Sequence, residues 1–119
     1  MKIAYDFDGT IIQSPIRNVF IKKIIFKMNP KINKDNVINI ITARTPIWKG
    51  ITWLSCRLLG LKNLNTIIFN PCSTWNIDYI SSWKYSVLVA HGFDAYVDSD
   101  YQILDNIRDL GFKGELICL

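Results

Sequence analysis

Short apolar segments alternate with stretches of helical periodicity along the whole chain. The apolar segments are residues 3–7, 37–41, 66–69, 95–97 and 115–118. Strands that alternate with helices indicate a parallel sheet with helices on both faces, and the right-handed crossover rule leaves few topologies. We therefore predict a three-layer, Rossmann-like α/β fold with a five-stranded, mostly parallel sheet. The 119 residues are enough for one compact domain, residues 1–119, and too few for two.

Two helices are predicted before residue 60. Ser14 caps the first, and Pro15 takes its first position in a helix over residues 15–28. Pro46 begins the second, which ends before Gly60. Each has an apolar face at helical spacing: Ile16, Phe20, Ile24 and Met28 in the first, and Ile47, Ile51, Leu54 and Leu58 in the second.

Two more helices are predicted in the second half of the chain. Ser82 is placed to cap a short helix that runs to Ala90 and ends at Gly92. The last helix has its apolar face at Ile103, Leu104, Ile107 and Leu110.

Polar residues follow the predicted strands at their carboxyl ends, where open α/β sheets bind ligands. These residues are Asp6, Asp8, Thr42, Asp98 and Asp100, whereas the third strand ends less informatively in Asn70. Charged side chains are rarely buried unless they are paired or bind a metal. Carboxylates without histidine or cysteine suit Mg²⁺, which takes one or two carboxylates together with a substrate phosphate.

A carboxylate beside a bound phosphate can act as a nucleophile and form an aspartyl-phosphate. A second carboxyl two residues later points to the other face of an ideal strand, and shares the site only if Gly9 lets the chain turn. Its natural task is proton transfer to the leaving group and from the attacking water. The pair Asp6 and Asp8 fits this division of roles.

The motif Asp6-Phe7-Asp8-Gly9-Thr10 resembles the first signature of the haloacid dehalogenase (HAD) superfamily, in its phosphatase branch. Thr42 resembles the second signature, Lys84 the third, and Asp98-Ser99-Asp100 the acidic fourth. The four occur in the family's order over essentially the whole chain. The second acid of the first signature is absent from the dehalogenases, so the resemblance favours cleavage of phosphate esters.

The resemblance implies a role for each matching residue. Asp6 would be the nucleophile and Asp8 the general acid and base. Mg²⁺ would be held by the Asp6 carboxylate, the Asp8 carbonyl and Asp98, while Thr42 and Lys84 would hold phosphoryl oxygens. Gly9 and Arg44 are further candidates for phosphate contact. With Ser82 as the cap, Lys84 falls in the first turn of its helix, where a bound anion would relieve its repulsion by the helix dipole.

The chain departs from the family's pattern in two respects. Asp98 and Asp100 are two residues apart, so Asp100 binds metal directly, binds it through water, or caps the following helix. Most relatives also carry a cap domain, and this chain has no room for one. A crevice without a cap must bind its substrate through a broad surface or borrow a lid from another subunit, which makes a homo-oligomer possible.

Simpler interpretations apply to several of these residues. Asp8-Gly9 suits an ordinary turn, Thr42 suits a helix cap before Pro46, and Arg44 suits a solvated position. Lys49 and Lys62 are alternatives to Lys84 as the phosphate-binding lysine. His91 suits the C-terminal end of a helix. Trp48, Trp53, Trp75 and Trp83 are interpreted as core or lid-edge residues, with a stacking surface as the alternative.

The composition limits the cellular setting. The longest apolar runs are four or five residues and the N-terminus lacks a signal-peptide pattern, so neither a membrane partner nor export is expected and the predicted location is the cytoplasm. Cys56, Cys72 and Cys118 are too few and too widely spaced for a disulfide framework or structural zinc, and are interpreted as packing residues.

The predicted function is therefore a Mg²⁺-dependent phosphomonoester hydrolase. Its substrate is a small phosphomonoester, a nucleotide or a nucleic-acid end. The missing cap, the net charge of +4 and the lysines of residues 21–34, which could supply a broad binding surface, favour the nucleic-acid end. The alternatives are a non-catalytic phosphate-binding or assembly module, since fold alone does not establish activity, and a phosphotransferase such as a mutase.

Overall fold

Five parallel strands form the centre of the protein in a computed structural model that describes residues 1–18, 20–74 and 76–119. The strand order is β5-β4-β1-β6-β7, and every pairing in this sheet is parallel. The strands are β1 (Ile3–Tyr5), β4 (Ile38–Thr42), β5 (Leu64–Phe69), β6 (Ala95–Asp98) and β7 (Glu115–Cys118). The predicted Rossmann-like α/β fold with a five-stranded parallel sheet is confirmed, with β1 in the middle.

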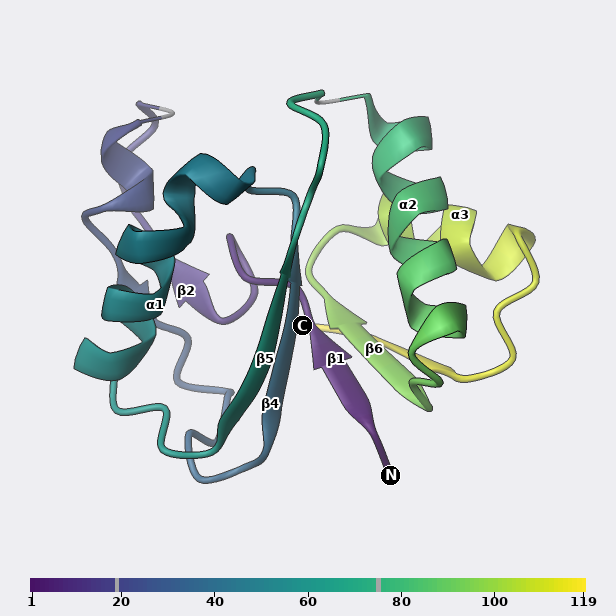
Figure 1. Ribbon diagram of the computed structural model, residues 1–119, viewed down its shortest axis with the longest axis horizontal. Helices are drawn as coiled ribbons and strands as arrows, with labels where there is room; N and C mark the ends of the chain where they lie inside the picture. Colours follow the sequence, from purple (N-terminus) through teal and green to yellow (C-terminus); the bar gives the residue numbers. More distant parts are fainter. Residues whose placement is uncertain (19, 75) are drawn as a thin grey trace.

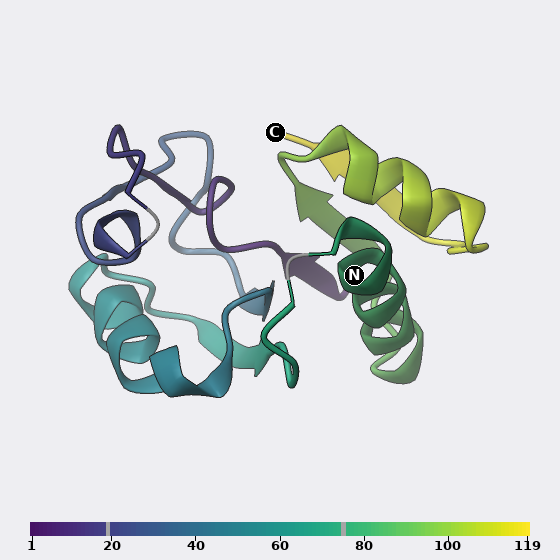
Figure 2. The same cartoon turned by 90° about the horizontal axis from the view of Figure 1, so that it is seen from above.

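Helices cover both faces of this sheet (Figures 1 and 2). One face carries α1 (Lys49–Leu58) with the 3₁₀ turns η1 (Ile21–Lys23) and η2 (Pro46–Trp48), and the other carries α2 (Ile77–Ala90) and α3 (Tyr101–Asp109). Two separate apolar cores lie between these layers. Neighbouring strand residues alternate between them, because successive side chains of a strand point to opposite faces. Ala4 and Ile41 join the α2–α3 core, whereas Tyr5 and Ile40 join the α1 core.

The C-terminal helix and strand follow their sequence pattern closely. Ile103, Leu104 and Ile107 are buried against the sheet, as the predicted apolar face requires, while Leu110 lies beyond α3 and is exposed. Asp100 caps α3, its side chain accepting a hydrogen bond from the Gln102 N–H. His91 is the C-terminal cap residue of α2, also as predicted.

The predicted helix over residues 15–28 is wrong. The described residues of this stretch contain η1 and the short strand β3 (Lys27–Met28), which pairs antiparallel with β2 (Ile12–Gln13), just before the stretch. The Ser14 hydroxyl does not cap a helix but donates to the Ile25 carbonyl, 2.6 Å away across the hairpin. We refer to residues 12–28 as the β2–β3 arm. Its isoleucines are β-branched and therefore suit strands at least as well as helices. Their spacing alone does not distinguish the two structures.

Helix α1 turns its expected apolar face outward. Ile47, Leu54 and Leu58 are between 56 and 87% exposed, and Ile51 is 41% exposed. The buried side chains of this helix are Thr52 and Cys56 instead. The expectation that the isoleucine and leucine stripe packs on the core is therefore wrong, because a buried arginine described below takes Thr52 as its partner.

Helix α2 begins earlier than predicted. Asn76 caps it through a hydrogen bond from the Tyr79 N–H, and Ser82 lies inside the helix rather than at its cap. Lys84 is consequently the eighth residue of α2 and not part of its first turn. The helix-dipole argument for phosphate binding by Lys84 is therefore wrong, and the lysine must be explained by its side-chain contacts.

Cysteine burial also departs from expectation at one position. Cys56 is fully buried and Cys118 half-buried, but Cys72 is exposed and does not serve as a packing residue. Trp48, Trp53 and Trp83 are half-buried, and Trp75 lies outside the described residues. In the described parts of the chain, every helix is too short or too polar to cross a membrane.

Candidate active site

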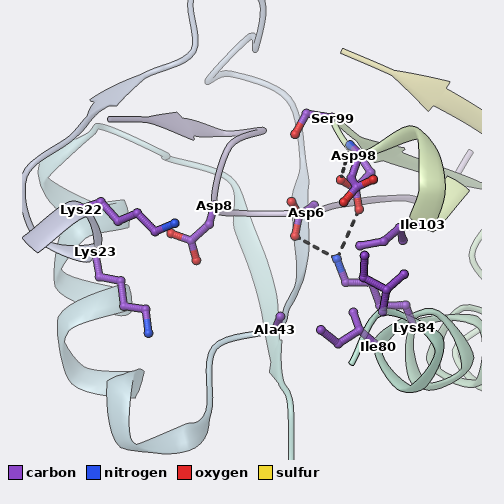
Figure 3. Close-up of a pocket in the computed structure, with 12 residues that line it drawn as sticks. Asp6, Asp8, Lys22, Lys23, Ala43, Ile80, Lys84, Asp98, Ser99 and Ile103 are labelled. Carbon is purple, nitrogen blue, oxygen red and sulfur yellow. Dashed lines mark hydrogen bonds and ion pairs between the residues drawn. The ribbon is translucent and has the colours of Figure 1, made fainter. Parts of the chain in front are cut away.

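A pocket of about 290 Å³ opens at the carboxyl ends of the central strands. All four acids predicted for the crevice line it: Asp6, Asp8, Asp98 and Asp100. Figure 3 shows Asp6 near the middle, with Asp8 on one side and Asp98 and Lys84 on the other. The prediction that one crevice collects these acids is confirmed. Three of the carboxylates nevertheless divide into two groups, each with its own cation, while Asp100 caps α3.

The first group is a buried cluster around the Lys84 ammonium. Lys84 Nζ lies 2.9 Å from Asp6 Oδ1 and 3.3 Å from Asp98 Oδ2. It also donates to the Tyr96 hydroxyl at 2.7 Å, and that hydroxyl donates to Asp98 Oδ2 at 2.6 Å. Lys84 and Asp98 are each 1% exposed. Lys84 is therefore the cation that compensates two buried carboxylates from neighbouring strands.

Burial shifts the proton equilibria of this cluster. It raises the pKa of Asp6 from 3.8 to about 7, although the positive charge of Lys84 opposes the shift. Burial lowers the pKa of Lys84, but the charges of Asp6 and Asp98 outweigh it and leave that pKa above its ordinary value. Burial and the Asp98 charge also raise the pKa of the Tyr96 hydroxyl well above 10. A second cation near Asp6 would lower the Asp6 pKa and favour its charged form.

The second group pairs Asp8 with Arg44. Arg44 Nε donates to Asp8 Oδ2 at 2.8 Å and Arg44 Nη2 donates to Oδ1 at 2.9 Å, which is a bidentate pair. The guanidinium also donates to the Thr52 hydroxyl and the Lys23 carbonyl, and it lies over the Phe7 ring. Arg44 is 1% exposed, so the interpretation as a solvated arginine is wrong. Its donors are used within the protein, while its predicted contact with phosphate stays a prediction.

The turn after β1 separates Asp6 from Asp8. Gly9 has a φ of +82°, a conformation that residues with a Cβ rarely adopt, and a Cβ here would lie 3.3 Å from the Ser99 hydroxyl. The Thr10 hydroxyl lies 3.2 Å from Asp6 Oδ2 and accepts a hydrogen bond from the Ser99 N–H. The buried Phe7 ring lies between the two acids in sequence and packs into the α1 core. This turn places the two carboxylates on opposite sides of the pocket.

The crevice was predicted to include the Thr42 hydroxyl as well as Asp100, but of these two only Asp100 lines the pocket. Thr42 ends β4, is buried, and accepts a hydrogen bond from the Arg44 N–H; the cap of η2 is Thr45, so Thr42 is not a helix cap. Asp100 accepts from the first turn of α3 and is its cap. The competing lysines, Lys49 and Lys62, do not line this pocket.

Asp6 and Asp98 have the donor set that the implied Mg²⁺ requires. Both are hard oxygen ligands on adjacent parallel strands, and two carboxylates with several waters are an ordinary Mg²⁺ set. Lys84 contacts one oxygen of each, and the second oxygens lie near Thr10 and the Asp100 N–H. Within the described part of the chain, no three acidic, histidine or cysteine side chains form a metal-binding group. The chemistry of Asp6 and Asp98 alone thus fits a two-carboxylate site, because the Asp8 side chain pairs with Arg44 and the Asp100 side chain caps α3.

Sequence reasoning missed several residues of the buried cluster and of the pocket wall. Tyr96 was interpreted only as a strand residue, yet its hydroxyl bridges Lys84 and Asp98. The two-residue spacing from Tyr96 to Asp98, which puts both side chains on one face of β6, was the available signal. The remaining wall residues are Lys22, Lys23, Ala43, Ile77, Ile80 and Ile103. Lys22 and Lys23 belong to the lysines of residues 21–34 that were expected to supply a substrate-binding surface, and both line the pocket. Ile77 and Ile80 were missed because the start of α2 was predicted too late.

No protein-family model, curated protein or solved structure gives a significant match to this chain.

Proposed function

We propose that the protein is a Mg²⁺-dependent phosphomonoester hydrolase of the HAD type, acting through an aspartyl-phosphate on Asp6. The observation that carries the proposal is the buried cluster in which Asp6 and Asp98, on adjacent strands, share the Lys84 ammonium. A buried arrangement of two carboxylates and one ammonium is costly to desolvate and is a weak source of stability. Its place at the carboxyl ends of parallel strands favours a ligand-binding role.

The proposed reaction has two steps. An Asp6 carboxylate oxygen attacks phosphorus, the ester P–O bond breaks, and the leaving alkoxide takes a proton from Asp8. A water then gives its proton to Asp8 and attacks the phosphorus of the aspartyl-phosphate, which releases inorganic phosphate and restores the Asp6 carboxylate. Lys84 lies where it can neutralise charge on the phosphoryl oxygens throughout.

Asp6, Asp98 and the Asp8 carbonyl would hold Mg²⁺, which would supply positive charge against the nucleophile and the phosphoryl group. Asp8 is suited to proton transfer because its side chain is 35% exposed at the pocket, compared with 12% for the side chain of Asp6. A protonated Asp8 can still accept from Arg44 with one oxygen while the other presents the proton to the leaving group. Arg44 would therefore orient Asp8 in both protonation states.

Asp6→Asn tests the nucleophile. We expect loss of phosphate release from p-nitrophenyl phosphate with Mg²⁺, by at least three orders of magnitude, and an unchanged circular dichroism spectrum. Asp105→Asn is the matched control, because Asp105 is an exposed acid on α3. Wild-type turnover by Asp6→Asn would contradict the proposed mechanism.

Asp8→Asn separates the proton-transfer role from binding. The variant should lose most activity on phosphate esters with poor leaving groups and least on aryl esters, whose leaving groups need no proton. An equal loss across a series of leaving groups would exclude Asp8 as the general acid.

One observation favours the non-catalytic alternative. Each carboxylate of the pocket other than the capping Asp100 already has a protein cation within 3.3 Å, so the site is electrostatically satisfied by its own residues. A phosphate-binding module predicts that p-nitrophenyl phosphate and other phosphoesters stay intact at every Mg²⁺ concentration while inorganic phosphate still binds. The same assay of phosphate release, run with and without Mg²⁺, therefore decides between the two functions.

A further inference from the structure

The two ends of the pocket carry opposite charge. Around Asp6, three carboxylates face one ammonium: Asp6, Asp98 and Asp100 against Lys84. Around Asp8, one carboxylate faces three basic residues: Arg44, Lys22 and Lys23. Figure 3 shows Lys22 and Lys23 on the Asp8 side of Asp6, opposite Lys84. The first end suits a metal ion and a phosphoryl group, whereas the second suits another anion.

Lys22 is the basic residue best placed to meet that anion. Arg44 is buried and already pairs with Asp8, and the Lys23 ammonium lies over the Trp48 ring at 4.5 Å. Burial also lowers the pKa of Lys23. Lys22 is half-buried in η1 and lines the pocket beside Asp8, whose carboxylate pairs with Arg44.

A second hollow continues the site beyond Lys22. It has a volume of about 190 Å³ and shares Asp8 and Lys22 with the main pocket; its other walls are Gly9, Ile12 and Ser14. A group bound on the far side of Lys22 would therefore extend from the main pocket into this hollow. Because Arg44 neutralises Asp8, the shared wall does not repel a second anion.

The wall of the main pocket across from Lys22 is apolar. Ile77 and Ile80 from α2 and Ile103 from α3 line it, and Figure 3 shows Ile80 and Ile103 beside Lys84. A branched aliphatic wall offers no partner to a sugar rich in hydroxyls, whose polar groups would stay unpaired. It suits the apolar face of a nucleobase.

We propose that the substrate is a nucleoside bearing two phosphates, with the terminal phosphomonoester at Asp6, the base against Ile77, Ile80 and Ile103, and the second phosphate held by Lys22. This inference rests on the proposed phosphatase function and names its substrate class. Two sources share this chemistry: a free nucleoside 3′,5′-bisphosphate, and the phosphorylated end of a nucleic acid, in which the second phosphate is the first phosphodiester.

The test compares Lys22→Met with Lys49→Met, which removes the same charge from an exposed position on α1 away from the pocket. The substrates are adenosine 3′,5′-bisphosphate, the two adenosine monophosphates, ribose 5-phosphate and p-nitrophenyl phosphate. We expect Lys22→Met to lower kcat/KM on the bisphosphate by about 10- to 100-fold, the usual value of a charged hydrogen bond. Its kcat/KM on p-nitrophenyl phosphate should match that of Lys49→Met. Ribose 5-phosphate, which has no base, should have a lower kcat/KM than the adenosine phosphates.

A binding measurement separates this inference from the proposed function. Adenosine 3′,5′-bisphosphate is titrated calorimetrically into Asp6→Asn and into Asp6→Asn/Lys22→Met. This measurement of binding does not depend on turnover. Weaker binding by the double variant supports the subsite even if no phosphoester is hydrolysed. Equal binding by both, or an equal loss of activity on bisphosphate and monophosphate, overturns it.

A 5′-phosphorylated dinucleotide distinguishes the two sources. A higher kcat/KM on the dinucleotide than on the free bisphosphate assigns the site to nucleic-acid ends, with a preference that shrinks as salt rises. The reverse order assigns it to the free nucleoside bisphosphate.

Discussion

The two sides of the sheet contribute differently to the site. The α2–α3 side provides Lys84, Tyr96 and Asp98, which enclose Asp6 in a buried charge cluster. The α1 side provides Arg44 and the lysines of η1, which surround a partly exposed Asp8. The Lys84 pairs leave at most 12% of any partner side chain exposed, whereas Asp8 is 35% exposed.

The same division appears in the charge of the whole chain. Ten of the fourteen Lys and Arg residues lie between residues 9 and 63, a range with one acid, Asp35. Apart from the sheet strand β4, this range forms the β2–β3 arm and α1, which lie on one face of the sheet (Figure 2). The difference indicates a division of roles, in which the enclosed side holds the reacting group and the open, basic side receives the substrate.

Of the changes that test this comparison, Lys84→Met should lower the unfolding free energy most. It leaves Asp6 and Asp98 buried without their cation, and removing one partner from a buried ion pair costs about 3–5 kcal/mol of unfolding free energy. Urea denaturation at pH 7.5 in EDTA measures the loss. Asp105→Asn, which breaks the exposed Arg108 pair, is the control, and a loss no larger than the control's would mean that the cluster contributes little to stability.

The pH dependence of stability should show the next largest effect, on the order of a few kcal/mol. The folded pKa of Asp6, about 7, lies above the unfolded value of 3.8, because burial disfavours its charge more than Lys84 favours it. Between these values the folded state binds more protons, so unfolding free energy falls as pH rises from 4 to 7 in metal-free protein. Asp98, Lys84 and Tyr96 surround this group, and Lys84 stays charged throughout this range because its pKa is raised.

Denaturation of wild-type protein and Asp6→Asn across this pH range isolates the contribution of Asp6. The wild type should lose stability relative to the variant with rising pH. A difference that stays constant would mean that Asp6 keeps its charge throughout.

The sequence predicted the enclosed side better than the open side. The β6–α3–β7 segment has one apolar stripe in α3 and acids at the end of β6, so its periodicity and its site residues agree with the structure. Asp6, Asp8 and Asp98 were found because they lie at strand ends, and Lys84 because its place before β6 resembles the third family signature. Their division into two ion-paired groups was not predicted, because it depends on which cation reaches which carboxylate.

The open side was mispredicted for physical reasons. The β2–β3 arm has isoleucines that satisfy both helical and strand patterns, and its shape is set by side-chain bonds such as Ser14 to Ile25 and Asn29 to the Thr10 carbonyl. Such contacts join residues 11 and 19 positions apart and leave no periodic signal. In α1, the helix face that carries Thr52 is turned inward, where Thr52 accepts a hydrogen bond from the buried Arg44, and the aliphatic face is turned outward.

Arg44→Met should destabilise the protein less than Lys84→Met. It removes both bonds to Asp8 and leaves the Thr52 hydroxyl buried, but Asp8 is exposed enough to be rehydrated, so we expect a loss of about 1–3 kcal/mol. Arg44→Lys keeps the charge without the bidentate geometry, so its unfolding free energy should lie between those of the wild type and Arg44→Met. A larger loss for Arg44→Met than for Lys84→Met would reverse the proposed assignment of the enclosed and open sides.

Substitutions on the outer face of η2 and α1 should have the smallest effect. Leu58 is 79% exposed and Ile47 is 87% exposed, so Leu58→Gln and Ile47→Gln remove little buried surface and should change unfolding free energy by less than about 0.5 kcal/mol. Ile107→Ala, at a fully buried position of α3, should cost about 2–5 kcal/mol and serves as the contrast. Denaturation is measured at two protein concentrations. If the Leu58 and Ile47 variants cost more than about 1 kcal/mol and their midpoints depend on concentration, this face is covered by a second copy of the chain, because only association makes stability depend on protein concentration.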